Sequence, residues 1–248
     1  MPRVARAKAE SGFYHVIAKG SGGQILFEED ADYRAFLGHL AKNCEKFDVV
    51  VRAYCLMSNH VHLLLEDHED HLSEAMKATI TSYALRFNKR NDHIGHVFQQ
   101  RFKSQPVEDD GYLLQAVRYI HNNPAKAGIC PADEYRWSSF HEYAAGIVGV
   151  ADTSLILQMC GSVDGFLAFS AAADNGAYRF AHRSRISDAE ARELASQVLG
   201  EIPPTNLKTM ERRHRDALLF DLKDAGLSVR QIERLTGIGK SLISKVTG

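Results

Sequence analysis

Two strand-like runs separated by only two residues constrain the fold of this chain most strongly. The first run, residues 47–57, and the second, residues 60–66, are both rich in β-branched, aromatic and aliphatic side chains. Ser58 and Asn59 leave room only for a tight turn between the two runs. The sequence therefore predicts a β-hairpin, and the rest of the expected fold is built around it.

Strand and helix patterns alternate on either side of this hairpin. Residues 13–18 and, less regularly, 97–107 are typical of strands, whereas apolar side chains recur every three or four residues over 30–47, 70–89 and 110–123. The resulting order is β-α-β-β-α-β followed by a helix. This order predicts an α+β fold with a ferredoxin-like, split βαβ antiparallel sheet and with helices on one face of the sheet.

The composition changes after the first predicted sheet, so we expect three regions. These are a first domain at residues 1–148, a helical linker region at 149–204 and an all-α module at 205–248. Pro203 and Pro204 mark the second break. In the last region, two short helical patterns flank a glycine-containing turn at residues 236–239, which predicts a helix-turn-helix DNA-binding module.

Charge and cysteine content exclude several classes of protein. The 30 Lys and Arg residues are balanced by 31 Asp and Glu residues, so binding to nucleic acid would have to come from local basic patches. The four cysteines form no Cys-x-x-Cys pair, which argues against a zinc ribbon or a disulfide framework. Apolar runs stay below the roughly 20 residues of a membrane helix, and the basic N-terminus lacks the apolar core of a secretory signal. We therefore expect a cytoplasmic protein without membrane association.

His60 and His62 carry the most evident chemistry of the hairpin. In a strand, residues i and i+2 project to the same face, so the two imidazoles are predicted to lie side by side. Such a pair is a ready set of two metal ligands. The alternative is a structural pair, with one histidine satisfied in the core and the other solvated.

The helix predicted over residues 110–123 supplies partners for the histidines. Tyr119 and Asn123 are four residues apart and share one helical face. The Asn123 carbonyl can ligate a cation, and the Tyr119 phenol can act as a nucleophile that forms a covalent intermediate. A free phenol has a pKa of about 10, so a metal that polarises a phosphoryl oxygen and steadies a leaving 3′ oxygen would assist it.

Purely structural roles for these residues also remain open. Tyr119 could be a core aromatic residue, and Asn123 could be a plain C-terminal helix cap. Tyr83 is the rival nucleophile, although its place on an amphipathic helix favours core packing. His121 is a weaker candidate ligand, because it lies two residues from Tyr119 and faces elsewhere on the helix.

Four stretches in this order resemble the single-tyrosine HUH transposases of the IS200/IS605 type, and most of all their REP-associated (RAYT-like) branch. They are MSNHVHLL at 57–64, FQQRFK at 98–103, YIHNNP at 119–124 with Ala127 and Gly128, and YRWSSF at 135–140. The resemblance covers about residues 10–145, so residues 1–148 would form the catalytic domain.

The resemblance implies a metal-dependent single-strand DNA endonuclease and strand transferase acting on hairpin-containing DNA. Tyr119 would be the nucleophile that becomes attached to the 5′ end of the cleaved strand. His60, His62 and Asn123 would bind Mg²⁺ or Mn²⁺. Relatives of this type also allow a homodimer, so Tyr119 could meet the histidines of its own chain or those of a partner.

Several basic and polar residues are candidate DNA contacts. Arg101 and Lys103 are two apart on the predicted strand and would share a face, where they could contact phosphates or form only a solvated edge. For Trp137, the sequence favours a role in packing over a role in stacking on DNA bases. The predicted contacts are Arg101, Lys103, Arg118, Arg230, Gln231, Lys240 and Ser241.

Two other functions stay open at the level of sequence. One is a DNA-binding regulator that keeps the fold without using the chemistry, with the helix-turn-helix carrying its role. The other is a metal-dependent phosphodiesterase in which water attacks and Tyr119 only orients the phosphate. The helix-turn-helix itself could also serve only as a packing unit.

Overall fold

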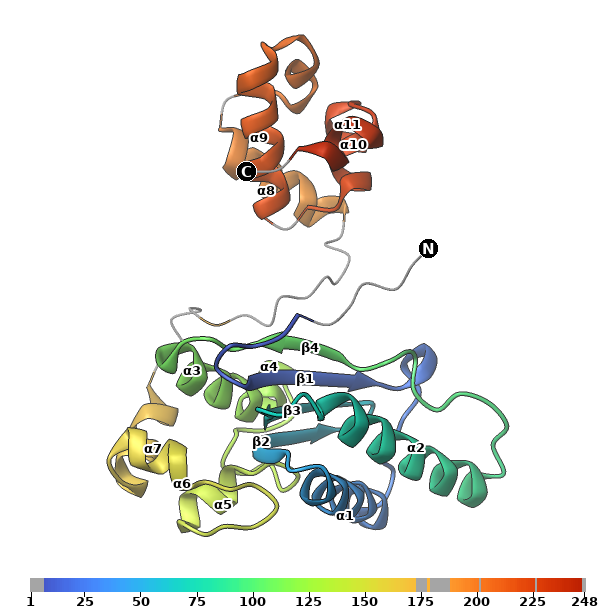
Figure 1. Ribbon diagram of the computed structural model, residues 1–248, viewed down its shortest axis with the longest axis vertical. Helices are drawn as coiled ribbons and strands as arrows, with labels where there is room; N and C mark the ends of the chain where they lie inside the picture. The colour runs from blue at the N-terminus through green and yellow to red at the C-terminus, as the bar shows by residue number, and fades with distance from the viewer. Residues whose placement is uncertain (1–6, 173–177, 179–187, 201, 226, 247–248) are drawn as a thin grey trace. The chain divides into compact units, whose positions relative to one another are not determined.

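The computed structural model divides the chain into two compact units, residues 1–180 and 181–248 (Figure 1). The predicted boundary after residue 148 falls inside the first unit, and the boundary after residue 204 falls inside the second. The structure describes residues 7–172, 178, 188–200, 202–225 and 227–246.

A four-stranded antiparallel sheet forms the centre of the first unit, with the strands in the order β2-β3-β1-β4. The strands are β1 (Phe13–Lys19), β2 (Val50–Met57), β3 (His60–Glu66) and β4 (Lys103–Pro106). The predicted hairpin is confirmed, because Met57 pairs with His60 across the turn.

The strand predicted over residues 97–107 is shorter than expected, because only β4 within it is a regular strand. The residues before β4 instead close over the end of β1. Phe98 forms an isolated bridge with Gly20, and the Gln99 N–H donates to the Lys19 carbonyl. This segment therefore caps the end of the sheet at which His60 lies.

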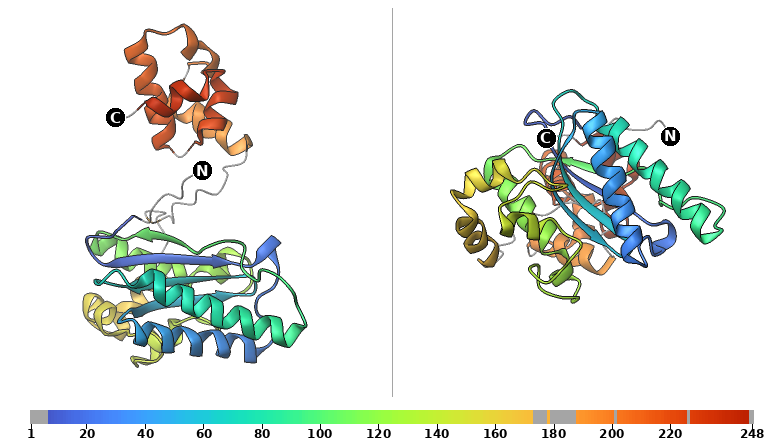
Figure 2. Two further views of the ribbon diagram at one scale, coloured as in Figure 1. Left: turned by 45° about the vertical axis from the view of Figure 1, so that its right-hand side comes forward. Right: turned by 90° about the horizontal axis from the view of Figure 1, so that it is seen from below.

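Helices cover both faces of the sheet, so the prediction of helices on one face was wrong. Helices α1 (Asp30–Lys46) and α2 (Leu72–Asn91) pack on the face that carries Leu63, whereas α3 (Asp110–His121) packs on the face that carries Leu64. The view from below in Figure 2 shows the sheet between these two layers. The reason lies in β2 and β3, whose side chains are apolar on both faces, so both faces must be covered.

Short helices complete the layer around α3. Asp109 begins α3 as its N-cap, with its carboxylate accepting the Gly111 and Tyr112 N–H groups. No single helix among the described residues is long and apolar enough to cross a bilayer. The helices Ser154–Cys160 and Val163–Ala171 meet that length and apolarity only as a pair, which is bent by 77°. The short helices are α4 (Asn123–Lys126), α5 (Phe140–Ala145), α6 (Ser154–Cys160) and α7 (Val163–Ala171).

The segment around Trp137 closes the outer edge of β2. The Leu56 N–H donates to the Trp137 carbonyl, and the Ser139 N–H donates to the Tyr54 carbonyl. The indole stacks on the ring of Tyr33 with 4.4 Å between ring centroids. These contacts favour the packing role that the sequence suggested for Trp137.

The second unit is helical around its own apolar core. Ser228 and Gln231 form a capping box at the start of α10, and Gly237 ends that helix with a φ of 65°, a left-handed conformation that suits glycine. The helices are α8 (Asp188–Leu199), α9 (Arg212–Asp224), α10 (Val229–Thr236) and α11 (Lys240–Lys245), with a 3₁₀ turn η2 (Pro204–Thr209) before α9.

Candidate active site

Three histidines share the sheet face that α3 covers. In β1, Lys19 pairs with His60, Ile17 pairs with His62, and His15 lies one step further along the same face. Directly opposite residues of an antiparallel pair project to the same side, and diagonal neighbours are within reach of long side chains. The register therefore brings His15 to the pair that the sequence singled out.

Each histidine of the pair is held through its Nδ1 atom. Nδ1 of His60 lies 2.7 Å from Oδ1 of Asn59, and Nδ1 of His62 lies 3.0 Å from Nε2 of His15. The two rings meet edge to face, with 5.1 Å between their centroids. His62 is buried, whereas His60 is only partly buried.

Tyr119 of α3 lies against these histidines in the same chain. Its ring centroid is 6.0 Å from that of His62 and 5.6 Å from that of His15. The ammonium of Lys126, one turn beyond the end of α3, lies 4.1 Å from the centroid of the Tyr119 ring. The structure thus brings together the predicted nucleophile, the two predicted histidine ligands and the cation of Lys126.

Asn123 is tied to the end of α3. Its amide nitrogen donates to the carbonyls of Tyr119 and Ile120, at 2.9 and 3.3 Å. This is the helix-cap geometry that the sequence left open for Asn123. Among the described residues no hydrogen bond joins Asn123 to either histidine of the pair, so its part as a metal ligand stays a prediction.

The histidine pair fits a divalent cation in one respect. Metal-ligating histidines commonly use one ring nitrogen for the metal and hold the other in a hydrogen bond. Both His60 and His62 have their Nδ1 atoms engaged in this manner, so Nε2 is the atom that each would present to a cation. Within the described parts of the chain, no group of three or more His, Cys, Asp or Glu side chains could hold a metal. A cation would therefore need the Asn123 amide, substrate oxygens or water as well.

Two lysines make this face of the sheet basic. Lys19 pairs with His60, and Lys103 pairs with Ile17, so both project on the side of the histidines. Desolvation first, and the charge of Lys103 second, lower the pKa of Lys19. Both lysines are exposed, so a phosphate could reach them.

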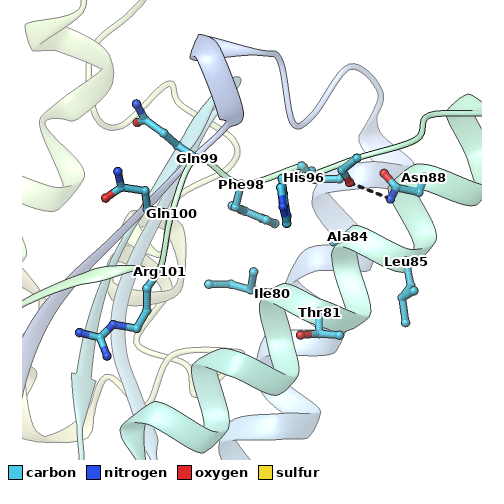
Figure 3. Close-up of a pocket in the computed structure, with 12 residues that line it drawn as sticks. Ile80, Thr81, Ala84, Leu85, Asn88, His96, Phe98, Gln99, Gln100 and Arg101 are labelled. Carbon is cyan, nitrogen blue, oxygen red and sulfur yellow. Dashed lines mark hydrogen bonds between the residues drawn. The ribbon is translucent and has the colours of Figure 1, made fainter. Parts of the chain in front are cut away.

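Arg101 does not share this face with Lys103 as predicted, because the regular strand begins only at Lys103. Arg101 instead lines a groove of about 440 Å³ between α2 and the segment before β4. Figure 3 shows Ile80 of α2 facing Phe98 and Arg101 across it. The predicted pair of phosphate contacts is therefore divided between two places in the first unit.

Arg118 was predicted as a DNA contact, and this prediction was wrong. Its side chain is only 4% exposed. The guanidinium donates to the carbonyls of Phe169 and Ala172 and lies 4.5 Å from the centre of the Phe169 ring. Arg118 therefore fastens the end of α7 to α3.

In the second unit the predicted DNA contacts differ in accessibility. Arg230, Lys240 and Ser241 are exposed, and the Lys240 ammonium lies 3.4 Å from the carboxylate of Glu233. Gln231 is buried, because its side chain closes the capping box with Ser228. Gln231 thus helps to cap the start of α10 and offers little surface for a base.

The alternative residues lie elsewhere in the first unit. Tyr83 is buried on the α1–α2 side, its hydroxyl donates to the Leu26 carbonyl, and burial raises the pKa of its phenol. His121 is buried against Ser139, with 2.8 Å between its Nε2 and the serine hydroxyl. Neither residue lies with the histidine pair.

Residues 10–123 match the protein family described as "Transposase IS200 like". A Haemophilus influenzae protein described as a REP-associated tyrosine transposase is 26% identical over 112 residues, which are 40% of this chain and 64% of that relative. The match therefore spans less than two thirds of the relative's length.

Two solved structures are also similar to this chain. A REP-associated tyrosine transposase bound to a REP hairpin has a TM-score of 0.51 and 17% identity, over 62% of this chain and 93% of that one. At this identity the likeness concerns the fold alone. A transposase from Deinococcus radiodurans R1 has a TM-score of 0.34 and 23% identity, over 49% of this chain and 97% of that one.

Proposed function

We propose that this chain is a REP-associated type of single-tyrosine transposase, which nicks and rejoins single-stranded DNA next to a hairpin in the cytoplasm. The observation that carries the proposal is the Tyr119 ring, which lies beside the buried His62 and under the Lys126 ammonium. The IS200-like family match supports the reaction class, and the name of the Haemophilus relative supports the branch. The solved relative with a REP hairpin supports the choice of DNA.

The proposal includes Mg²⁺ or Mn²⁺ as cofactor, held by Nε2 of His60 and of His62 with the Asn123 carbonyl as third ligand. A divalent cation supplies Lewis-acid polarisation of the scissile phosphate and charge stabilisation at the leaving oxygen. Two imidazoles and one amide carry no negative charge, so affinity for Mg²⁺ should be modest. Because Mn²⁺ suits imidazole better, it should support cleavage at least as well as Mg²⁺.

In the proposed step, the Tyr119 hydroxyl oxygen attacks the phosphorus of the DNA backbone. A bond forms between that oxygen and phosphorus while the bond from phosphorus to the 3′ oxygen breaks. The phenol releases its proton to solvent, and the departing 3′ oxygen takes up one. Attack by a 3′ hydroxyl on the phosphotyrosine reverses the step, so strands are rejoined without ATP.

The basic residues around Tyr119 have separate parts in this proposal. Lys126 lies close enough to the Tyr119 ring to stabilise negative charge on the phenol oxygen and on the transferred phosphate. Lys19 and Lys103 would hold the phosphates of the strand across the histidine face. Arg101 would contact DNA beside the groove next to α2.

The finer features of the fold belong to the same proposal. The strand order, in which β3 lies between β1 and β2, supports a split βαβ, ferredoxin-like sheet. Helices α10 and α11 with the turn at Gly237 support a helix-turn-helix. In that module Arg230, Lys240 and Ser241 would bind DNA and help to select the site.

A suicide-substrate assay tests this proposal. A labelled library of hairpin oligonucleotides with single-stranded flanks is incubated with the full chain and Mn²⁺, and the products are separated on a denaturing gel. We expect a labelled protein band that disappears in Tyr119→Phe and with excess EDTA. Tyr112→Phe is the matched control, because Tyr112 is an exposed tyrosine on the same helix.

Each other outcome overturns a named part of the proposal. A band that persists in Tyr119→Phe would move the nucleophile elsewhere. A band that persists in EDTA would exclude the metal. Repeated cleavage without any adduct would establish a water-using phosphodiesterase. Tight binding of a hairpin that is never cleaved would establish a DNA-binding regulator.

A further inference from the structure

We propose that His15 and Tyr178 are positioning residues that decide which nitrogen of His62 carries the proton, and hence whether His62 can ligate a cation. The inference rests on the metal role proposed for His62. It adds two residues to the site, one from β1 and one that lies well beyond the matched segment at residues 10–123.

The three side chains form a continuous buried chain. The Tyr178 hydroxyl lies 2.9 Å from Nδ1 of His15, and Nε2 of His15 lies 3.0 Å from Nδ1 of His62. The exposed fractions of the three residues are 4%, 0% and 3%. The ring of Tyr178 is stacked on that of His15 and also contacts the ring of Tyr119, with centroid separations of 5.9 and 5.6 Å. Such burial holds all three rings in place.

The hydrogen bonds of this chain are coupled in direction. A neutral imidazole has one N–H donor and one acceptor nitrogen. If Tyr178 donates to Nδ1 of His15, then His15 must donate from Nε2 to Nδ1 of His62. If Tyr178 accepts from Nδ1 of His15, then Nε2 of His15 accepts the Nδ1 proton of His62. The orientation of one hydroxyl therefore propagates through both imidazoles.

Only one of these two arrangements leaves His62 able to bind a cation. When His62 accepts at Nδ1, its own proton is on Nε2, and that nitrogen cannot be a ligand. When His62 donates from Nδ1, Nε2 carries the lone pair that a cation needs. The ligand-competent state is thus the one in which Tyr178 accepts. Burial raises the pKa of Tyr178, so the residue stays a neutral phenol that is able to accept or donate.

The position of the proton on His60 does not depend on Tyr178, so the two histidines of the pair can be compared. Its Nδ1 lies 2.7 Å from an amide oxygen of Asn59, which can only accept. Nδ1 of His60 is therefore the donor, and Nε2 is the acceptor regardless of Tyr178. The proposed control acts on one ligand of the pair and leaves the other unchanged.

Tyr178→Phe is the sharpest test, because it removes only the hydroxyl. Without that acceptor, His15 favours the tautomer with its proton on Nε2, and the proton of His62 is displaced to its Nε2. We expect the affinity for Mn²⁺, measured on the full chain by electron paramagnetic resonance without DNA, to fall by about tenfold or more. Tyr112→Phe is the matched control, because Tyr112 contacts Tyr178 only through its ring, at 6.3 Å, and affinity should not change.

A second pair of variants separates hydrogen bonding from packing. His15→Gln offers an amide oxygen that accepts from Nδ1 of His62, so it should retain most of the affinity. His15→Phe fills the space without an acceptor, so it should lose affinity to the same extent as Tyr178→Phe. Loss in both variants, with unchanged thermal unfolding, would overturn the proposal.

The tautomer itself can be observed. In protein labelled with ¹⁵N-histidine, long-range proton–nitrogen spectra distinguish an Nδ1–H ring from an Nε2–H ring. We expect Mg²⁺ to hold His62 as Nδ1–H in the wild-type chain, and the Nε2–H form to dominate in Tyr178→Phe. An unchanged His62 tautomer in Tyr178→Phe would overturn the proposal, even if metal affinity fell.

His62→Ala distinguishes the failure of this inference from the failure of the proposed function. If His62→Ala binds Mn²⁺ as well as the wild-type chain does, the metal site itself is wrong. If His62→Ala loses binding while Tyr178→Phe and His15→Phe keep it, the metal site stands and only the control by His15 and Tyr178 is wrong.

Discussion

The ring centroid of Tyr119 lies 6.0 Å from that of His62, and both residues belong to the same chain. The sequence left open whether Tyr119 meets its own histidines or those of a second copy. Because α3 packs directly over β2 and β3, the tyrosine reaches the histidine face without help from a partner. The proposed nucleophile and the two proposed histidine ligands therefore lie together in one chain.

This arrangement predicts the result of a mixing experiment. A chain carrying His60→Ala and His62→Ala is co-expressed with a chain carrying Tyr119→Phe, so that mixed dimers can form if dimers exist. Each chain lacks one half of its own site, so the mixture should yield no more covalent adduct than either variant alone. Recovery of adduct in the mixture would show that the tyrosine of one chain acts on the histidines of another.

The position of Lys126 leads to a second prediction, which concerns the rate of adduct formation. Lys126→Met keeps the aliphatic stem but removes the charge that lies 4.1 Å from the Tyr119 ring. The ammonium stabilises the negative charge that develops in the transition state more than it stabilises the neutral phenol, and about 1.4 kcal/mol in a barrier is about tenfold in rate. The rate of adduct formation should fall about tenfold, whereas Lys126→Arg should keep most of it.

The control for Lys126 is Lys89→Met, which removes an exposed lysine near the end of α2. A rate loss in Lys89→Met equal to that in Lys126→Met would mean that overall charge, rather than the position over Tyr119, sets the rate. Binding of the hairpin, measured separately by fluorescence anisotropy, shows whether Lys126→Met acts on binding or on the chemical step.

Lys103 and Arg118 were both predicted as DNA contacts, but the structure leads us to expect different effects of mutating them. Lys103→Met should change DNA binding, and Arg118→Met should change the stability of the fold. Lys103→Met should lower the slope of log K against log salt by about one, because one phosphate contact is lost. Arg118→Met should leave this slope unchanged but destabilise the fold by roughly 2 kcal/mol, since the buried guanidinium and its partly buried hydrogen bonds to the Phe169 and Ala172 carbonyls are lost. Anisotropy at several salt concentrations and urea unfolding measure the two effects. A reduced salt slope in Arg118→Met would restore it as a DNA contact.

Local patterns were sufficient for part of the site. The period of two in a strand placed His60 and His62 on one face, and the period of 3.6 in a helix defined the segment that carries Tyr119. The predicted start of this helix at residue 110 agrees with the structure, in which Asp109 is the N-cap of α3. What these patterns lacked was the register between β1 and β3, which brings His15 diagonally beside His62. Tyr178 gave no local signal, because its contacts with His15 and Tyr119 join residues far apart in the sequence.

Two mistaken predictions had signals that could have corrected them. The nearly unbroken apolar sequence of β2 and β3 is typical of strands buried on both faces, yet helices were expected on one face only. Arg118 lies on α3 among apolar neighbours, which is a signal for burial that its charge alone does not give. Both cases show that burial depends on what packs against an element, which the periodicity of the element alone does not report.

The burial of His121 leads to a prediction of how the stability of the first unit depends on pH. Burial first, and the charge of His141 second, lower the pKa of His121 from 6.5 to about 3. Between these two values the unfolded chain binds a proton that the folded chain cannot bind. Stability from this residue is therefore complete above about pH 6.5 and falls as the pH is lowered, by up to about 1.4 kcal/mol per pH unit.

The test compares His121→Gln with the wild-type chain by urea unfolding at pH 7 and pH 5, followed through the fluorescence of Trp137, the single tryptophan. Trp137 lies in the first unit, so it reports on the fold that contains His121. The wild-type chain should lose about 2 kcal/mol more than the variant does between the two pH values. The other histidines are common to both chains, so their contributions cancel in this difference. Equal losses would mean that His121 takes up a proton inside the fold at its ordinary pKa, which would require water or a carboxylate to reach the Ser139 side of α3.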